Sequence, residues 1–158
     1  MIANYLQILQ DSLIKKLNIL MQIEAKSLEQ ADMLKLSNVS MEMIDANMDA
    51  KAKLIEQALS LDEGFEHLYA RIKAELVSKK EQYKQQIAEI QKLIAKVTEK
   101  STSIQAIEAR NKAEMEIYFS RQRKGLQSKR NAMSVASNYY QNMNKVKHVA
   151  PQFMDRKK

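Results

Sequence analysis

Residues 83–104 read YKQQIAEIQKLIAKVTEKSTSI, and this stretch decides the fold. Its apolar and small residues are spaced alternately four and three apart, the period of a helix that packs along another helix. The row consists of Tyr83, Ile87, Ile90, Ile94, Val97, Ser101 and Ile104. The same register then becomes polar and aromatic, through Glu108, Asn111, Met115, Tyr118 and Gln122. We therefore expect a long helix from about Ser78 to about Met133.

Two amphipathic helices are expected before this stretch. Apolar residues recur every three or four positions from about Ile2 to Leu36, and again from Met41 to about Val77. Ser40 can cap the second helix, because its hydroxyl can accept a backbone N–H of the first turn. Gly64 interrupts the second row, but glycine costs only about 1 kcal/mol inside a helix. We therefore expect one continuous second helix with a weak point at residues 62–64.

The composition excludes most other fold classes. The chain has two glycines, one proline and no cysteine, so it lacks the turn residues of sandwiches and barrels and the thiols of a disulfide framework. The sequence predicts an all-α protein, an antiparallel, coiled-coil-like bundle of three long helices over residues 1–133. Residues 134–158 are expected to form a flexible basic C-terminal tail that becomes helical on binding, because serine, asparagine and Pro151 weaken a helix there.

The net charge of +7 is unevenly distributed along the chain. Acidic and basic residues nearly balance over residues 1–100, whereas Asp155 is the only acidic residue after Ile117. A basic C-terminal segment of this kind suits nucleic acid, anionic lipid or an acidic protein partner. The apolar runs are too short for a membrane-spanning helix or a signal peptide, and the chain has no cysteine, so we expect a cytoplasmic location.

The sequence offers little catalytic chemistry. Its two histidines are His67, beside an apolar row, and His148, in the basic tail. Glu63 and His67 are spaced like a pair of metal ligands, but no third ligand completes a site. Phosphate-binding loops need glycines that the chain lacks. We therefore expect no enzymatic activity, no metal and no cofactor.

The apolar residues inside the basic segment are the candidate functional feature. They have no evident partner if the core ends near residue 110, and an exposed apolar row on a helix usually binds a partner helix. The basic residues among them would steer acidic partners and speed encounter. The candidate partner-binding residues are Tyr118, Phe119, Arg121, Arg123, Leu126, Met133, Tyr139, Tyr140 and Met143.

Several short motifs resemble one bacterial family. The second helix carries Ile44-Asp45, Lys53-Leu54-Ile55, Leu59, Leu61-Asp62 and Phe65, and the third carries Glu108-Ala109-Arg110-Asn111. Tyr139-Tyr140 and the ending Gln152-Phe153-Met154-Asp155 complete the set. Together these motifs resemble the flagellar hook–filament-junction export chaperones, the FlgN-like family. Gln141-Asn142 follows the tyrosines where that family often has an acidic residue and glycine.

The resemblance implies a cytoplasmic chaperone of the flagellar type III export system. Such a protein binds hook-associated proteins through its C-terminal helix and tail, prevents their premature assembly and delivers them to the export gate. Two alternatives stay open. One is a structural coiled-coil protein that self-associates through the third helix, and the other is a basic-tailed nucleic-acid-binding protein. The sequence does not decide whether the chain forms a homodimer.

Overall fold

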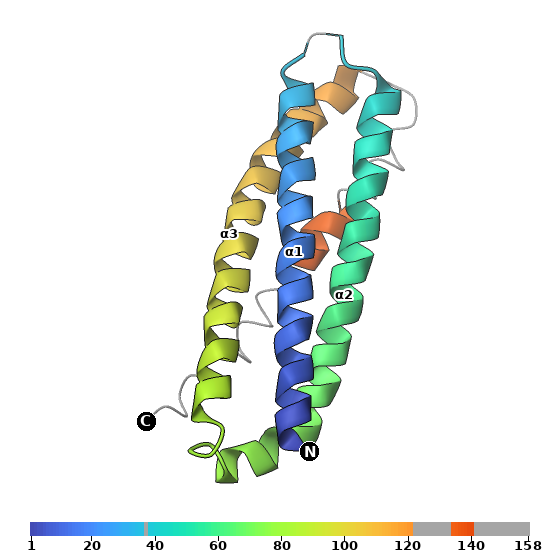
Figure 1. The fold of residues 1–158 in the computed structure, drawn as a ribbon. Coiled ribbons are helices and arrows are strands. Elements are labelled where there is room, and N and C mark those ends of the chain that lie inside the picture. The colour runs from blue at the N-terminus through green and yellow to red at the C-terminus, as the bar shows by residue number, and fades with distance from the viewer. Residues whose placement is uncertain (37, 122–133, 141–158) are drawn as a thin grey trace.

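The protein is all-helical in the residues that its computed structural model describes, which are 1–36, 38–121 and 134–140. Three long helices follow one another along the chain: α1 (Ile2–Leu34), α2 (Met41–Ser78) and α3 (Lys84–Arg121) (Figure 1). Residues 134–140 form a further short helix. The prediction of an all-α protein with three long helices packed together is confirmed.

The junctions between the helices follow from local hydrogen bonds. Ser40 caps α2 as expected, because its Oγ accepts the backbone N–H of Met43 at 3.2 Å. Ser78 is the last residue of α2, where its Oγ donates to the Glu75 carbonyl at 2.8 Å. The turn that follows occupies residues 79–83, so α3 begins at Lys84, later than the predicted start near Ser78. The predicted extension of α3 to Met133 lies outside the described residues beyond Arg121.

The second helix is continuous through its glycine. Gly64 lies within α2, and a Cβ built at this position meets no atom within 4 Å. The glycine is therefore not required by close packing. The expected weak point does not break the helix, and Ala58 and Phe65 are buried on the same face on either side of it.

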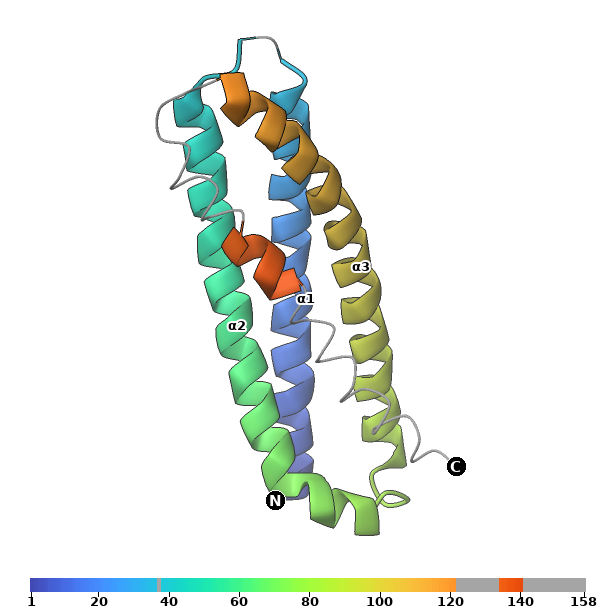
Figure 2. The ribbon, with the colours of Figure 1, turned by 180° about the vertical axis from the view of Figure 1, so that it is seen from behind.

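The three long helices are arranged around α1. The chain changes direction at each loop, and α1 packs against both α2 and α3 (Figure 1). In contrast, no Cα atom of α2 lies within 8 Å of one in α3. Seen from behind, the short helix 134–140 lies between α2 and α3 (Figure 2).

The core consists of two hydrophobic clusters. The larger one contains buried residues of all three long helices together with Tyr139 and Tyr140. The smaller one lies toward the α1–α2 loop and contains Met33, Ile44, Met48, Met115 and Phe119. The apolar row that decided the fold is buried from Ile87 to Ile104 as predicted. Its polar continuation is buried too at Asn111, between the two clusters.

Candidate functional site

A cavity of about 590 Å³ lies between α2, α3 and the short helix 134–140. It exists because α2 and α3 do not pack directly on each other along their length. Each long helix and the short helix contribute side chains to its wall. They include Gln30, Met48, Ile55, Met115, Val135 and Tyr140. The walls are thus mainly apolar. Their polar groups include Lys51, Glu108 and Asn111.

Tyr139 and Tyr140 attach the short helix to the bundle. Both side chains are buried, and their rings meet edge to face at a centroid distance of 5.5 Å. The Gln105 side-chain amide donates to the Tyr140 backbone carbonyl at 2.8 Å. Neither tyrosine hydroxyl has a hydrogen-bond partner among the described residues. The apolar parts of the rings are therefore buried favourably, whereas each hydroxyl loses its hydrogen bonds to water without gaining one from a described residue.

Burial raises the pKa of both tyrosines far above the ordinary range. The loss of hydration is the main cause, because the phenolate form would be charged in an apolar environment. The Asp62 carboxylate raises the pKa of Tyr139 further, and the Glu108 carboxylate does the same for Tyr140. Both phenols are accordingly neutral wherever the short helix is packed on the bundle.

Tyr118 and Phe119 lie at the end of α3. Phe119 is fully buried in the smaller hydrophobic cluster. Tyr118 is partly buried, packs edge to face on Phe119 at 6.0 Å and donates its hydroxyl to the Val39 carbonyl at 3.4 Å. Partial burial, with a smaller effect of Asp45, raises the Tyr118 pKa. These two aromatic residues thus hold the end of α3 against the α1–α2 loop.

The expectation that the apolar candidate residues lack a partner within the chain is wrong for Tyr118, Phe119, Tyr139 and Tyr140. The sequence predicts a core that ends near residue 110, whereas the core continues to Phe119 and includes Tyr139 and Tyr140 of the short helix. Arg121 is exposed at the end of α3. The other four candidate partner-binding residues lie outside the described part of the chain, namely Arg123, Leu126, Met133 and Met143.

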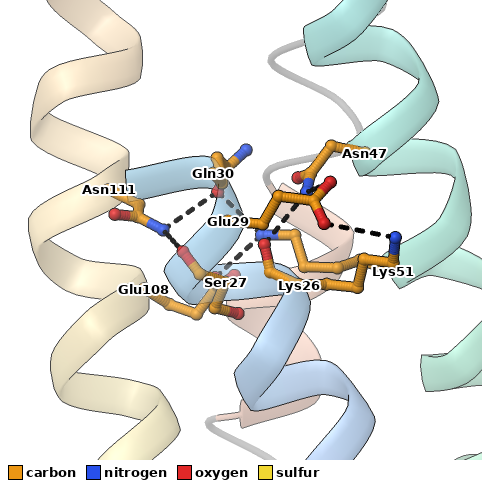
Figure 3. A network of polar contacts seen from close by, with 8 residues as sticks. All are labelled: Lys26, Ser27, Glu29, Gln30, Asn47, Lys51, Glu108 and Asn111. Carbon is orange, nitrogen blue, oxygen red and sulfur yellow. Dashed lines mark hydrogen bonds and ion pairs between the residues drawn. The ribbon is translucent and has the colours of Figure 1, made fainter. Parts of the chain in front are cut away.

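A buried polar layer connects all three long helices beside the cavity (Figure 3). On one side, Lys51 Nζ lies 2.8 Å from both Gln30 Oε1 and Glu108 Oε1. Gln30 Oε1 also accepts from Asn111 Nδ2 at 3.1 Å, and the same Asn111 amide donates to the Ser27 carbonyl at 2.8 Å. The layer separates the two hydrophobic clusters and gives each helix a defined position relative to the others.

The same layer extends from α1 to the start of α2. Asn47 Nδ2 donates to the Lys26 carbonyl at 2.9 Å and to Glu29 Oε1 at 3.3 Å (Figure 3). Burial lowers the pKa of Lys51, and the neighbouring Glu108 carboxylate opposes this by stabilising the charged amine. The contact between Lys51 and Glu108 is therefore a buried ion pair, and removal of either partner would leave the other charge buried and destabilise the fold.

A second buried ion pair joins Lys16 of α1 to Asp62 of α2. Burial raises the Asp62 pKa, and Lys16 opposes this shift. The sequence prediction includes neither buried lysine, although the spacing of each places it among core residues. Lys16 falls between Leu13 and Leu20, and Lys51 falls between Met48 and Ile55, at core positions of otherwise apolar rows. A lysine at such a position predicts a buried acidic partner on a neighbouring helix.

The described residues offer no metal-binding cluster of three or more candidate ligands. His67 and Glu63 are both exposed on α2, so their spacing places them on a solvated face. Over the same described ranges, no helix is both long and apolar enough to cross a lipid bilayer.

Comparisons with protein families, with curated proteins and with solved structures find no match to this chain.

Proposed function

We propose that this protein is a cytoplasmic chaperone of the flagellar type III export system. It would bind hook-associated proteins, prevent their premature assembly and deliver them to the export gate, without enzymatic activity or a cofactor. The client and the pathway rest on the resemblance to the FlgN-like family. The observation that best supports a helix-binding role is that one helical segment of this chain already lies between α2 and α3 (Figure 2), with a cavity beside it.

The proposed mode of binding is helix-in-groove capture. An amphipathic helix of the client lies along α2 and α3, where these helices do not pack on each other. Ala109 and Val135 are exposed apolar residues that line the cavity and contact the client, whereas Met48, Ile55 and Met115 are buried in its wall. The short helix 134–140 supports this mode, because its own aromatic residues are buried in the same region.

The candidate residues then take different roles. Tyr140 lines the cavity and contacts the client directly, whereas Phe119 acts by holding α3 in the fold. Arg121 is exposed and steers acidic clients toward the groove. Contacts by Arg123, Leu126, Met133 and Met143 remain predictions of the sequence, as does the ordering of the tail on binding.

Blocking the groove with a long charged side chain tests the proposal. Ala109 is an exposed residue of α3 that lines the cavity, so Ala109→Arg should weaken binding of purified hook-associated proteins by more than about tenfold. Ala70→Arg is the matched control, because Ala70 is exposed on α2 and does not line the cavity. Equal affinities of the two variants for the client, measured by calorimetry, would show that the client does not bind at this cavity. No binding by the unmodified protein would reject the chaperone function.

The two alternatives give different results in simple assays. A nucleic-acid-binding protein would lose affinity steeply between low and moderate salt. Self-association through the apolar row of α3 is disfavoured, because that row is buried within the bundle from Ile87 to Ile104.

A further inference from the structure

A second apolar row runs along the outer face of α1. Ile14, Met21 and Leu28 are 50%, 53% and 49% exposed, although each is a large hydrophobic residue. They are separated by seven residues, and exposed Asn18 and Ala25 fill the positions between them. The complete row, here called the outer row, is Ile14, Asn18, Met21, Ala25 and Leu28. Its spacings of four and three are those of a coiled-coil contact face.

The outer row faces away from the core of its own bundle. With 100° between successive residues, Met21 lies nearly opposite the buried Ile23 and Gln30 on the circumference of α1. The row is about 21 Å long. On α2, the large exposed apolar residues Met43, Leu59 and Val77 are too far apart to form a comparable row. Four large apolar side chains exposed on one helix, three of them in line, mark a contact face.

The charges that continue the outer row choose its partner. Asp11 extends the row at one end, Asp32 and Lys35 extend it at the other, and all three are exposed. If a second copy of α1 packs against the row in the opposite direction, Asp11 of each copy faces Lys35 of the other. Lys15 and Glu29 flank the row on one side and would form two further attractive pairs between the copies. These four charges at and beside the ends of the outer row are therefore complementary to themselves in one orientation.

The same residues disfavour parallel pairing. Parallel copies would place Asp11 opposite Asp11, Lys35 opposite Lys35 and Glu24 beside Glu29. In the antiparallel orientation Glu24 approaches only the Glu24 of the second copy. That repulsion is reduced because Lys100 Nζ lies 2.9 Å from Glu24 Oε1. Charge complementarity thus selects a two-fold antiparallel arrangement.

We propose that this protein forms a homodimer in which the outer rows of two α1 helices pack antiparallel. One pair of helix faces is small compared with the interface of a permanent dimer, so the association is reversible and depends on concentration. In this register Met21 packs against Ala25, Leu28 packs against Asn18, and Ile14 faces Asp32 at each edge of the interface. The cavity between α2 and α3 is not part of this surface, so the dimer does not depend on the proposed chaperone function.

Sedimentation velocity of the full chain, from about 10 μM to about 1 mM, tests the dimer. We expect the sedimentation coefficient to rise with concentration, and Met21→Lys should weaken the dimer by more than about tenfold because it places two cations in the interface. Leu59→Lys is the matched control, since Leu59 is 39% exposed on α2. A monomer at every concentration, or equal dimerisation of the two variants, would overturn the proposal.

A mixing experiment tests the orientation. Lys15→Glu alone and Glu29→Lys alone should each weaken the homodimer, because each creates two like-charged pairs. An equal mixture of the two variants should restore association, since both pairs become attractive again. Lys73→Glu is the control for a charge change at an exposed site on α2. Thermal melting of each variant verifies its folding, and failure of the mixture to recover would reject the antiparallel arrangement.

Discussion

Lys51 Nζ of α2 lies 2.8 Å from Glu108 Oε1 of α3, and this ion pair joins two helices whose backbones do not approach each other. The pair crosses the bundle beside the cavity, and Gln30 of α1 accepts a further hydrogen bond from the same amine. Polar contacts therefore help to fix the separation of α2 and α3 at this level. The shape of the candidate binding groove depends on these contacts as well as on apolar packing.

Removal of Glu108 should destabilise the protein strongly. The Lys51 side chain is only 6% exposed, so Glu108→Ala leaves a buried cation with an amide oxygen in place of its ion-pair partner. We expect a loss of about 3 kcal/mol in the free energy of unfolding, measured by urea denaturation. The double variant Lys51→Met/Glu108→Leu should recover most of that loss, because an apolar pair has no charge to hydrate.

The surface pair between Glu75 and Lys79 is the control for this measurement. Both side chains are about half exposed, so Glu75→Ala should cost less than about 1 kcal/mol. Similar losses for Glu108→Ala and Glu75→Ala would show that burial does not strengthen the dependence on the Lys51–Glu108 pair.

Phe119→Ala should unfold the end of α3 rather than act only on a partner. Phe119 is fully buried with Met33, Ile44 and Met115, so its truncation creates a cavity and should cost about 3–5 kcal/mol. The neighbouring Ile117 is 47% exposed, and Ile117→Ala should cost less than about 1 kcal/mol. Thermal or urea unfolding of the two variants provides the comparison. Equal stability would contradict the burial of Phe119.

The regular part of the fold could be predicted because it is encoded by local spacing. The row from Ile87 to Ile104, the cap at Ser40 and the continuity of α2 through Gly64 each depend on neighbouring residues, and each is confirmed. The predicted start of α3 near Ser78 is too early, because a turn at residues 79–83 separates the two helices.

The candidate site depends on contacts between segments far apart in the sequence. Tyr139 and Tyr140 were expected to be free of the bundle, since nothing in the local sequence shows that α2 and α3 leave room for them. The buried ion pairs were missed for a related reason. A lysine in an apolar row indicates a buried charge, but its partners Asp62 and Glu108 are identified only when the helices are placed side by side.

Gly64→Ala should stabilise the protein. Gly64 is exposed in the interior of α2, and an added Cβ meets no atom within 4 Å. Alanine restricts the unfolded chain more than glycine does, so the free energy of unfolding should rise by about 0.5–1 kcal/mol. Urea denaturation measures this change. A loss of stability would mean that the glycine conformation matters here, for example through a bend in α2 that alanine resists.

Alkaline pH should release the short helix 134–140 from the bundle. Burial holds the pKa of Tyr139 and Tyr140 well above the ordinary value of about 10 that each phenol has when released. The packed state therefore keeps both protons while the released state loses them. Packing is unaffected by these groups below pH 10 and weakens above about pH 10, by about 1.4 kcal/mol per pH unit for each tyrosine.

Ultraviolet titration of tyrosinate in the full chain should show two phenols that ionise late and together. In the double variant Tyr139→Phe/Tyr140→Phe this late step should disappear, while the effect of Lys51, whose lowered pKa favours folding as pH rises, is common to both proteins. If the unmodified chain and the double variant lose stability equally above pH 10, these two hydroxyls are not the groups that make the packing sensitive to alkali.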